Sequence, residues 1–257
     1  MSQTLPEVSK TDDLNAELLA LVRRYRAAAG PGLRLLNALG SRAENLIERV
    51  PAPVRDQLEG ATKRGMELSF DAAAASRSRV RDQDDWFNTA LATAMGAAGG
   101  LGGLPSALAE VPVTVTVLMR AIQGIAEEHG FDPASEEVRM ACLEVFAAAG
   151  PLADDDGADM GFLTMRVALS GPGMRVMMAR VTPIFAQVLG RKLAAQAVPV
   201  LGAVAGAATN YIYTAYYQDI ARVRFGLMDI ARRRGLDHDA LVRTFKEMVR
   251  EERIAAA

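Results

Sequence analysis

The chain has 257 residues, of which half are hydrophobic, and its 29 basic residues nearly balance its 31 acidic ones. This length permits one large domain or two small ones, and the apolar content is enough for a sizeable core. A formal net charge of −2 excludes a global basic field, so we expect no nucleic-acid partner. The single cysteine, Cys142, excludes an internal disulfide framework and fits a reducing compartment.

The first part of the chain favours helices, because Ala and Leu carry most of the apolar weight and aromatic residues are few. Its polar, acidic N-terminus lacks the apolar stretch of a signal peptide, so we expect a cytoplasmic protein. We predict a disordered segment over 1–11 and then helices over about 12–29, 33–50 and 53–81. Gly30-Pro31-Gly32 is predicted to end the first of these helices.

The second part of the chain contains one strand-like run, Val113 to Val117, whose neighbours favour a buried helix. This helix is predicted over 112–129, with Gly130 after its end. Asp132 is predicted to cap the next helix, which runs to Gly150-Pro151. Later helices are predicted over about 159–169, 173–190 and 219–234, and Asp237 is predicted to cap a last one.

Two long segments, 86–109 and 193–217, carry no charge at all. We predict an all-α protein, a single bundle-like domain over 12–257 with these two Gly/Ala-rich segments at its centre. About 20 apolar residues span a bilayer, but the glycines and Pro105 make the first segment a poor membrane helix. Three interpretations stay open: a tightly packed soluble helix pair, peripheral or reversible membrane insertion, and a stable membrane hairpin.

The second apolar segment has features of close helix packing. Gly202 and Gly206 form a GxxxG pair that lets two helices approach closely, and Asn210 follows one turn later on the same face. The tyrosines after Asn210 form an aromatic end of the kind found at membrane interfaces. The candidates for helix packing or membrane contact in both segments are Gly96, Gly99, Gly100, Gly102, Gly103, Pro199, Gly202, Gly206, Tyr213 and Tyr217.

Motifs for catalysis and for metal binding are missing from the sequence. It contains no phosphate loop and no GxSxG, HExxH or ExxH motif. The acidic run from Asp154 to Asp159 lacks the spacing of a calcium loop and is interpreted as a solvated loop. His129 is interpreted as a helix C-terminal residue and His238 as an exposed one. We therefore identify no catalytic residue and expect no metal and no cofactor.

Polar side chains in or beside apolar stretches are the candidates for a functional cluster. Buried charges are normally paired, so a Glu110–Arg or Asp219–Arg pair that locks helices together is one interpretation. The other interpretation is a cluster that binds a lipid head group or a small anion. The candidates are Glu110, Arg120, Asn210, Asp219 and Arg224.

Two blocks of the sequence resemble the hallmarks of the EcsC family. In residues 109–139 an acidic residue and a proline precede an apolar run, and a Gly-aromatic-Asp-Pro turn follows it. Residues 198–225 reproduce the pattern Pro-x-x-Gly-x-x-x-Gly-x-x-x-Asn and its Ala and Arg-Phe extension. The resemblance implies a bacterial protein related to a neighbour of an ABC-transporter operon, and it supplies no catalytic residues. The matching residues of the second block are Pro199, Gly202, Gly206, Asn210, Ala221, Arg224 and Phe225.

We expect a non-enzymatic helical module that associates with membranes or lipids and accompanies or regulates a transporter. Its expected partners are membrane lipid or a membrane protein, with homo-oligomers left open, and its expected place is the cytoplasm at the inner face of the cell membrane. One alternative is a soluble interaction scaffold whose glycine segments are core packing. The other is an unrecognised enzyme, which would require Glu110, Arg120, Asp219 or Arg224 to converge in a pocket.

Overall fold

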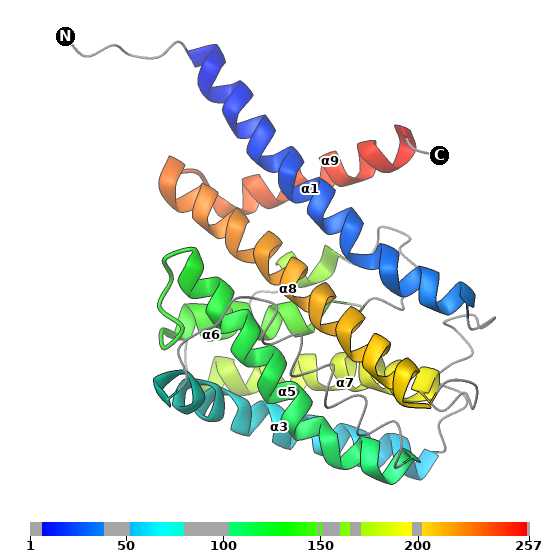
Figure 1. The fold of residues 1–257 in the computed structure, drawn as a ribbon. Coiled ribbons are helices and arrows are strands. Elements are labelled where there is room, and N and C mark those ends of the chain that lie inside the picture. Colours follow the sequence, from blue (N-terminus) through cyan, green and yellow to red (C-terminus); the bar gives the residue numbers. More distant parts are fainter. Residues whose placement is uncertain are drawn as a thin grey trace.

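Seven α-helices and one short 3-10 helix make up the part of the chain that the structure, a computed structural model, describes (Figure 1). The described residues are 7–38, 52–79, 103–148, 150, 160–164, 171–196 and 202–255, and no strand occurs among them. The prediction of an all-α protein is therefore confirmed. In chain order the elements are α1 (Glu7–Ala38), α3 (Ala52–Arg79), α5 (Gly103–Glu128), α6 (Glu136–Phe146), η2 (Met160–Thr164), α7 (Gly171–Gln196), α8 (Gly202–Arg234) and α9 (His238–Ala255).

The long helix α8 connects most of the other elements. It has 33 residues and contacts α1, α5, α6, α7 and α9. In Figure 1, α1 and α9 lie on one side of α8, while α3 packs against α5 and α7 on the other side. Groups on α8 are therefore positioned against side chains from nearly every part of the fold.

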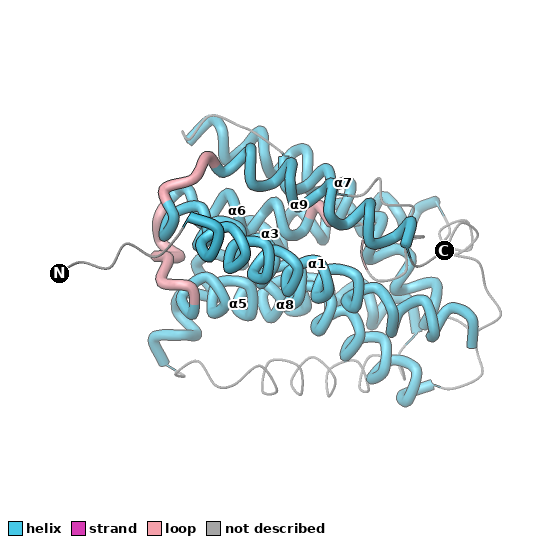
Figure 2. The backbone as a smooth tube through the Cα atoms, turned by 90° about the horizontal axis from the view of Figure 1, so that it is seen from above, coloured by secondary structure: helices cyan, strands magenta, loops and turns pink. Residues whose placement is uncertain are grey.

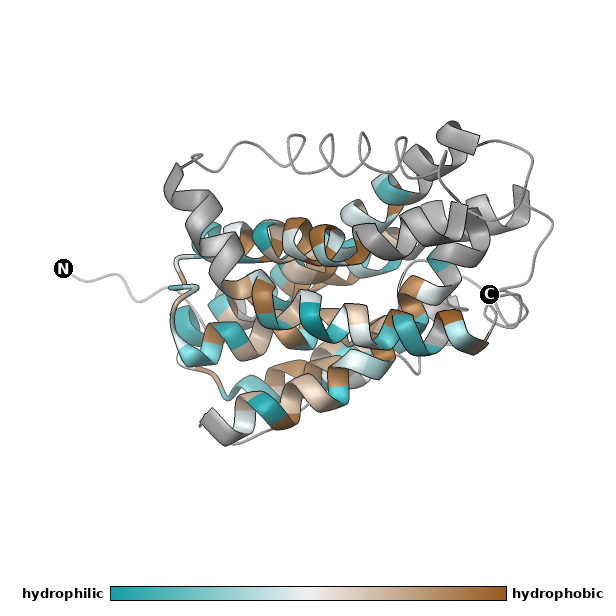
Figure 3. Cartoon of the chain, turned by 90° about the horizontal axis from the view of Figure 1, so that it is seen from below, coloured by the Kyte–Doolittle hydropathy of each residue, from teal (hydrophilic) through white to brown (hydrophobic). Residues whose placement is uncertain are grey.

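One continuous cluster of buried hydrophobic side chains includes residues of all seven α-helices. Figure 3 shows the hydrophobic residues concentrated where the helices face one another. The aromatic centre of the cluster consists of Phe146, Phe185 and Tyr217, whose ring centroids lie 4.5 to 5.7 Å apart. Aromatic pairs at this spacing stabilise a core beyond the area that they bury. Such a shared core is what a single helical domain requires.

α5 ends just before Gly130, as the sequence predicted. This glycine has a φ of 73°, and its N–H donates to the Glu127 carbonyl at 2.8 Å. The Phe131 N–H donates to the Ala126 carbonyl at 3.0 Å, which completes a Schellman motif. The loop that follows lies at one end of the bundle (Figure 2), where Arg232 of α8 donates to the Gly130 carbonyl at 3.0 Å.

Two other local predictions are confirmed. The strand-like run is helical within α5, and its Val115 and Val117 are buried, whereas Val113 is 49% exposed. Asp237 caps α9, because its Oδ1 accepts a hydrogen bond from the Ala240 N–H at 2.8 Å.

The boundaries of α1 differ from the predicted ones. The helix begins at Glu7, so the prediction of disorder over 1–11 is wrong for residues 7–11, and residues 1–6 lie outside the described part. The helix also continues through Gly30-Pro31-Gly32 to Ala38. A proline removes one helical N–H, and the packing of α1 along α8 outweighs this local loss. The predicted helix over 33–50 therefore begins as part of α1, and its remainder is not described.

The start of α6 also differs from the prediction. Ser135 is the N-cap, because its Oγ accepts from the Val138 N–H at 3.3 Å. Asp132 instead accepts from the Ala134 N–H at 2.9 Å and stabilises the turn before the helix. Both residue types are good caps, so local preference alone did not separate them.

Four later elements differ in extent or type from the predictions. α6 ends at Phe146, four residues before Gly150, and the described part of 159–169 is a 3-10 helix, Met160–Thr164. α7 extends to Gln196. α8 passes through Asp219 without a break, so the end of the second apolar segment and the charged helix after it form one element.

Candidate functional site

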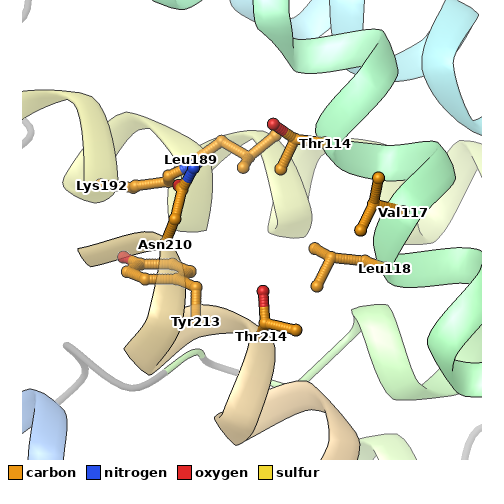
Figure 4. A pocket seen from close by; sticks show the side chains of 8 residues that line it. All are labelled: Thr114, Val117, Leu118, Leu189, Lys192, Asn210, Tyr213 and Thr214. Carbon is orange, nitrogen blue, oxygen red and sulfur yellow. The ribbon is translucent and has the colours of Figure 1, made fainter. Parts of the chain in front are cut away.

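A small pocket lies between α5, α7 and α8 (Figure 4). Its empty volume is about 330 Å³ when the adjoining space open to solvent is included. The enclosed part has room for about one water molecule. It brings the predicted candidates Asn210 and Tyr213 together with side chains from the two neighbouring helices. The lining residues are Thr114, Val117, Leu118, Leu189, Lys192, Asn210, Tyr213 and Thr214.

The pocket combines an aliphatic wall with buried polar side chains. Lys192 and Asn210 are only 5% and 3% exposed. Figure 4 shows them next to each other on one side of the pocket, with Val117 and Leu118 of α5 on the other. Burying an ammonium or an amide is costly unless its polar atoms are satisfied.

A second group of buried polar side chains lies where α6, α8 and α9 meet. Arg224 donates from Nε to Oε2 of Glu144 at 2.6 Å, and its Nη1 lies 3.0 Å from Nε2 of His238. Because a guanidinium only donates, Nε2 of His238 is the acceptor in this contact. Burial raises the pKa of the Glu144 carboxyl, and the Arg224 guanidinium offsets part of that rise. The cluster holds three helices together.

His238 was predicted to be exposed, and that prediction is wrong, because the residue is half-buried. The reason is tertiary: the turn after α8 brings the first residue of α9 back against Arg224.

Asp219 forms the predicted kind of ion pair between helices. Its Oδ1 accepts from Nη1 of Arg24 at 2.7 Å, which joins α8 to α1. The two side chains are 29% and 43% exposed, so the pair is worth at most about 1 kcal/mol. This contact positions helices and offers no site for a ligand.

The predicted polar candidates do not converge in one place. Asp219 and Arg224 belong to separate ion pairs, and Arg120 is buried within α5. Of the five polar candidates, Asn210 is the one among those with described side chains that lines the pocket. The side chain of Glu110 is outside the described part, so a Glu110–Arg pair stays a prediction. The enzyme alternative, which required convergence, gains no support from the candidates that the structure describes.

Three of the four tyrosines of α8 lie inside the protein, which contradicts the interpretation of the group as a membrane-interface end. Tyr213, Tyr216 and Tyr217 are 2%, 7% and 0% exposed. The Tyr213 hydroxyl donates to the Val188 carbonyl at 3.2 Å, so it packs α8 against α7. Of this group Tyr211 is exposed, at 53%. Tyr213 and Tyr217 therefore serve helix packing rather than membrane contact.

The glycine candidates are mostly beyond the described part of the chain. Close helix packing over glycine occurs at other positions: a Cβ on Gly65 would lie 3.1 Å from Cα of Pro112, where α3 crosses α5. Among the described candidates, Gly103 and Gly202 are the first residues of α5 and α8, and Gly206 lies in the second turn of α8. The candidates outside the described residues are Gly96, Gly99, Gly100, Gly102 and Pro199.

The outer surface of α7 carries a feature that the sequence reasoning missed. Arg175 and Arg180 are exposed, and so are the apolar side chains of Val176 (44%) and Ile184 (37%). Arg180 is one helical turn from both of these apolar residues. We call these four residues the α7 face. α7 contains no Asp or Glu, so no carboxylate of this helix neutralises the arginines.

The signal for the α7 face is present in the sequence. From Met160 to Gln218 the chain has no Asp or Glu, although the whole protein has more acidic than basic residues. The basic residues of this acid-free stretch are Arg166, Arg175, Arg180, Arg191 and Lys192.

Within the described ranges, no helix is both long and apolar enough to cross a membrane. The same ranges contain no group of three or more His, Cys, Asp or Glu side chains that could hold a metal ion. Cys142 is fully buried in α6.

The fold and its pocket define an all-α protein whose buried charged side chains mainly join helices. The chain belongs to the EcsC protein family, because the model of that family matches residues 35–227. The resemblance found in the sequence is thereby confirmed, over a longer stretch than the two motif blocks. No curated protein and no solved structure matches the chain.

Proposed function

We propose that this protein is a non-enzymatic helical module that associates peripherally with membranes and uses the α7 face to bind anionic lipid. The observation that carries the proposal is the pairing of exposed Arg175 and Arg180 with exposed Val176 and Ile184 on a helix without acidic residues. Helices at membrane interfaces combine basic and apolar side chains in this way.

The electrostatic and apolar parts of the α7 face would act together. A basic residue close to an anionic membrane surface contributes about 1 kcal/mol, so Arg175 and Arg180 together supply about 2 kcal/mol. Burial of Val176 and Ile184 in the head-group region adds apolar transfer energy of about 25 cal/mol per Å². The sum amounts to weak, reversible and salt-sensitive binding rather than permanent insertion.

The cytoplasmic leaflet of a cell membrane is rich in anionic lipid, so the inner face is the expected binding surface. Membrane association would also bring the module to the surface that holds the transporter which it is proposed to accompany or regulate.

Flotation of the purified protein with lipid vesicles tests this function. We expect flotation with vesicles that contain phosphatidylglycerol, none with pure phosphatidylcholine, and a loss of binding as salt is raised. Arg175→Glu together with Arg180→Glu should abolish flotation.

The matched control changes the same number of charges elsewhere, with Arg23→Glu in α1 and Arg243→Glu in α9. Both residues are exposed, and α1 and α9 lie on the other side of α8 from α7 (Figure 1). Equal loss of flotation in the control pair would reduce the effect to net charge and contradict the α7 face. Absence of flotation in the wild type would leave the soluble interaction scaffold as the better description.

A further inference from the structure

Pro183 interrupts the backbone hydrogen bonding of α7 beside the α7 face. It follows Arg180 and precedes Ile184, inside a helix that continues from Gly171 to Gln196. A proline has no N–H, so the carbonyl of Ala179, four residues earlier, lacks the donor that closes each turn of an α-helix. α7 therefore carries a backbone acceptor that its own hydrogen-bond ladder does not use.

This carbonyl belongs to the outer side of α7. Ala179 is exposed and Pro183 is half-buried. Ala179 follows Arg175 by one helical turn and directly precedes Arg180, so residues with guanidinium donors flank it on both sides. Side chains one turn apart on a helix start only about 5–6 Å from each other. The α7 face thus offers two guanidinium groups and one backbone acceptor to the same small group.

The acceptor becomes important when the α7 face meets a membrane. In water, a carbonyl of this kind is hydrogen-bonded to solvent. Contact with lipid removes that solvent, and an unsatisfied carbonyl in apolar surroundings is costly. A lipid whose head group supplies a hydrogen-bond donor avoids this cost, whereas an anionic lipid without a donor does not.

The charges of α7 narrow the choice of head group. Guanidinium groups such as those of Arg175 and Arg180 suit a phosphate. The helix contains no Asp or Glu that could pair with the ammonium of an ethanolamine or serine head group. A glycerol head group meets both conditions, because it joins a phosphate charge to uncharged hydroxyl donors.

We propose that the α7 face binds the head group of phosphatidylglycerol, with the phosphate on Arg175 and Arg180 and a glycerol hydroxyl donating to the Ala179 carbonyl. The inference rests on the proposed membrane function and narrows it from anionic lipid in general to one class of head group. Pro183 is a positioning residue in this site, since it keeps the carbonyl available.

The test compares vesicles that contain phosphatidylglycerol with vesicles that contain phosphatidylmethanol, each at the same mole fraction in phosphatidylcholine. The two lipids have the same acyl chains and the same single negative charge, but the methyl head group has no hydroxyl to donate. Flotation over a range of lipid concentrations gives a partition coefficient for each. We expect the wild type to bind phosphatidylglycerol about two- to tenfold more strongly, which corresponds to one hydrogen bond.

Pro183→Ala returns the N–H that satisfies the Ala179 carbonyl and leaves every charge in place. It should lower binding to phosphatidylglycerol to the level of phosphatidylmethanol and leave binding to phosphatidylmethanol unchanged. A change in helix curvature alone would alter binding to both lipids by the same factor, so the ratio isolates the hydrogen bond. Pro112→Ala is the matched control and should keep the wild-type ratio, because Pro112 also lies inside a helix, α5, but outside the α7 face.

The inference and the membrane function fail separately. Equal binding of the two lipids by the wild type would overturn the glycerol site and leave the binding of anionic lipid standing. A wild-type ratio in Pro183→Ala would do the same. Absence of binding to both lipids would overturn the membrane function and the inference with it. Arg175→Glu with Arg180→Glu should lose both lipids, since it removes the attraction that they share.

Discussion

Arg224 of α8 and Glu144 of α6 form an ion pair at 2.6 Å in which each side chain is less than a tenth exposed. Both charges have lost their water, so each depends on the other for compensation. The pair joins α6 to α8, which contacts five other helices. The pair therefore lends itself to a double-mutant cycle.

We predict that Glu144→Gln lowers the free energy of unfolding by about 3–5 kcal/mol, because it leaves the buried Arg224 charge without its carboxylate. Arg224→Met should lower the free energy of unfolding by a similar amount, because it leaves the buried Glu144 carboxylate without its guanidinium. The double variant Glu144→Leu with Arg224→Met should lose far less than the sum of the two single losses. Urea denaturation measures all of these, and additive single losses would contradict a coupled pair.

Acid should weaken the contact between α1 and α8. Burial by itself would raise the pKa of Glu17, but hydrogen bonds and charge from Arg234 and Arg233 outweigh it and hold this pKa below 4.5. A carboxyl with a lowered folded pKa binds protons less readily when folded, so its stabilising contribution is present above pH 4.5 and is lost as the pH falls below it.

We therefore expect Glu17→Gln to flatten the fall of the unfolding midpoint in acid, and more so at low salt. Glu59→Gln, which changes an exposed glutamate of α3, should leave the acid dependence unchanged. The pH dependence of the Glu144 contribution to stability has the opposite sign. Because the pKa of Glu144 is raised in the folded protein, this contribution falls as the pH rises above 4.5. An identical pH profile for Glu17→Gln and the wild type would refute the role of the Glu17 contacts.

Two glycines have a left-handed backbone, and a comparison of the two separates the cost of backbone strain from the cost of a steric clash with an added Cβ. Gly150 has a φ of 84°, and a Cβ there would lie 2.6 Å from Cγ1 of Val188. Gly130 has a φ of 73°, but its nearest obstacle is the flexible end of Arg232 at 3.4 Å. We predict that Gly130→Ala costs about 1–2 kcal/mol from backbone strain alone.

Gly150→Ala should cost about 1–3 kcal/mol more than Gly130→Ala, since overpacking adds to the strain. Val188→Ala made together with Gly150→Ala should recover part of this extra cost, although it opens space in the core. Thermal and chemical unfolding of the three variants give the comparison. Equal losses for the two glycine variants would show that the chain near Val188 yields without cost.

The parts of the fold that the sequence predicted well are those with a local cause. The glycine end of α5, the Asp237 cap and the helical state of Val113 to Val117 depend on neighbouring residues alone. The break at Gly30-Pro31-Gly32 was predicted from the same kind of signal and did not occur, because packing along α8 decided it. Local rules therefore fail where tertiary contacts are stronger.

The candidate site was less predictable, because its parts come from distant positions. Asn210 was identified from its place after the GxxxG pair. Lys192 lines the same pocket because α7 packs against α8, and the sequence does not show that packing. Tyr217 shows the reverse problem, since an aromatic cluster looks the same in sequence whether it meets lipid or a core. The absence of acidic residues from this stretch could be seen in the sequence. The side of α7 that faces solvent could not.

The apolar half of the α7 face gives the sharpest separation of the forces in membrane binding. Val176→Ser together with Ile184→Ser should weaken vesicle binding at every salt concentration by about 1 kcal/mol per side chain, because the lost term is apolar transfer. The salt dependence itself should stay as in the wild type, since both arginines remain. Arg180→Gln should do the reverse and flatten the salt dependence.

Leu68→Ser in α3 is the matched control, because Leu68 is 64% exposed and lies outside the α7 face. An equal loss with Leu68→Ser would mean that any exposed apolar side chain promotes binding, and the orientation on α7 would have to be abandoned.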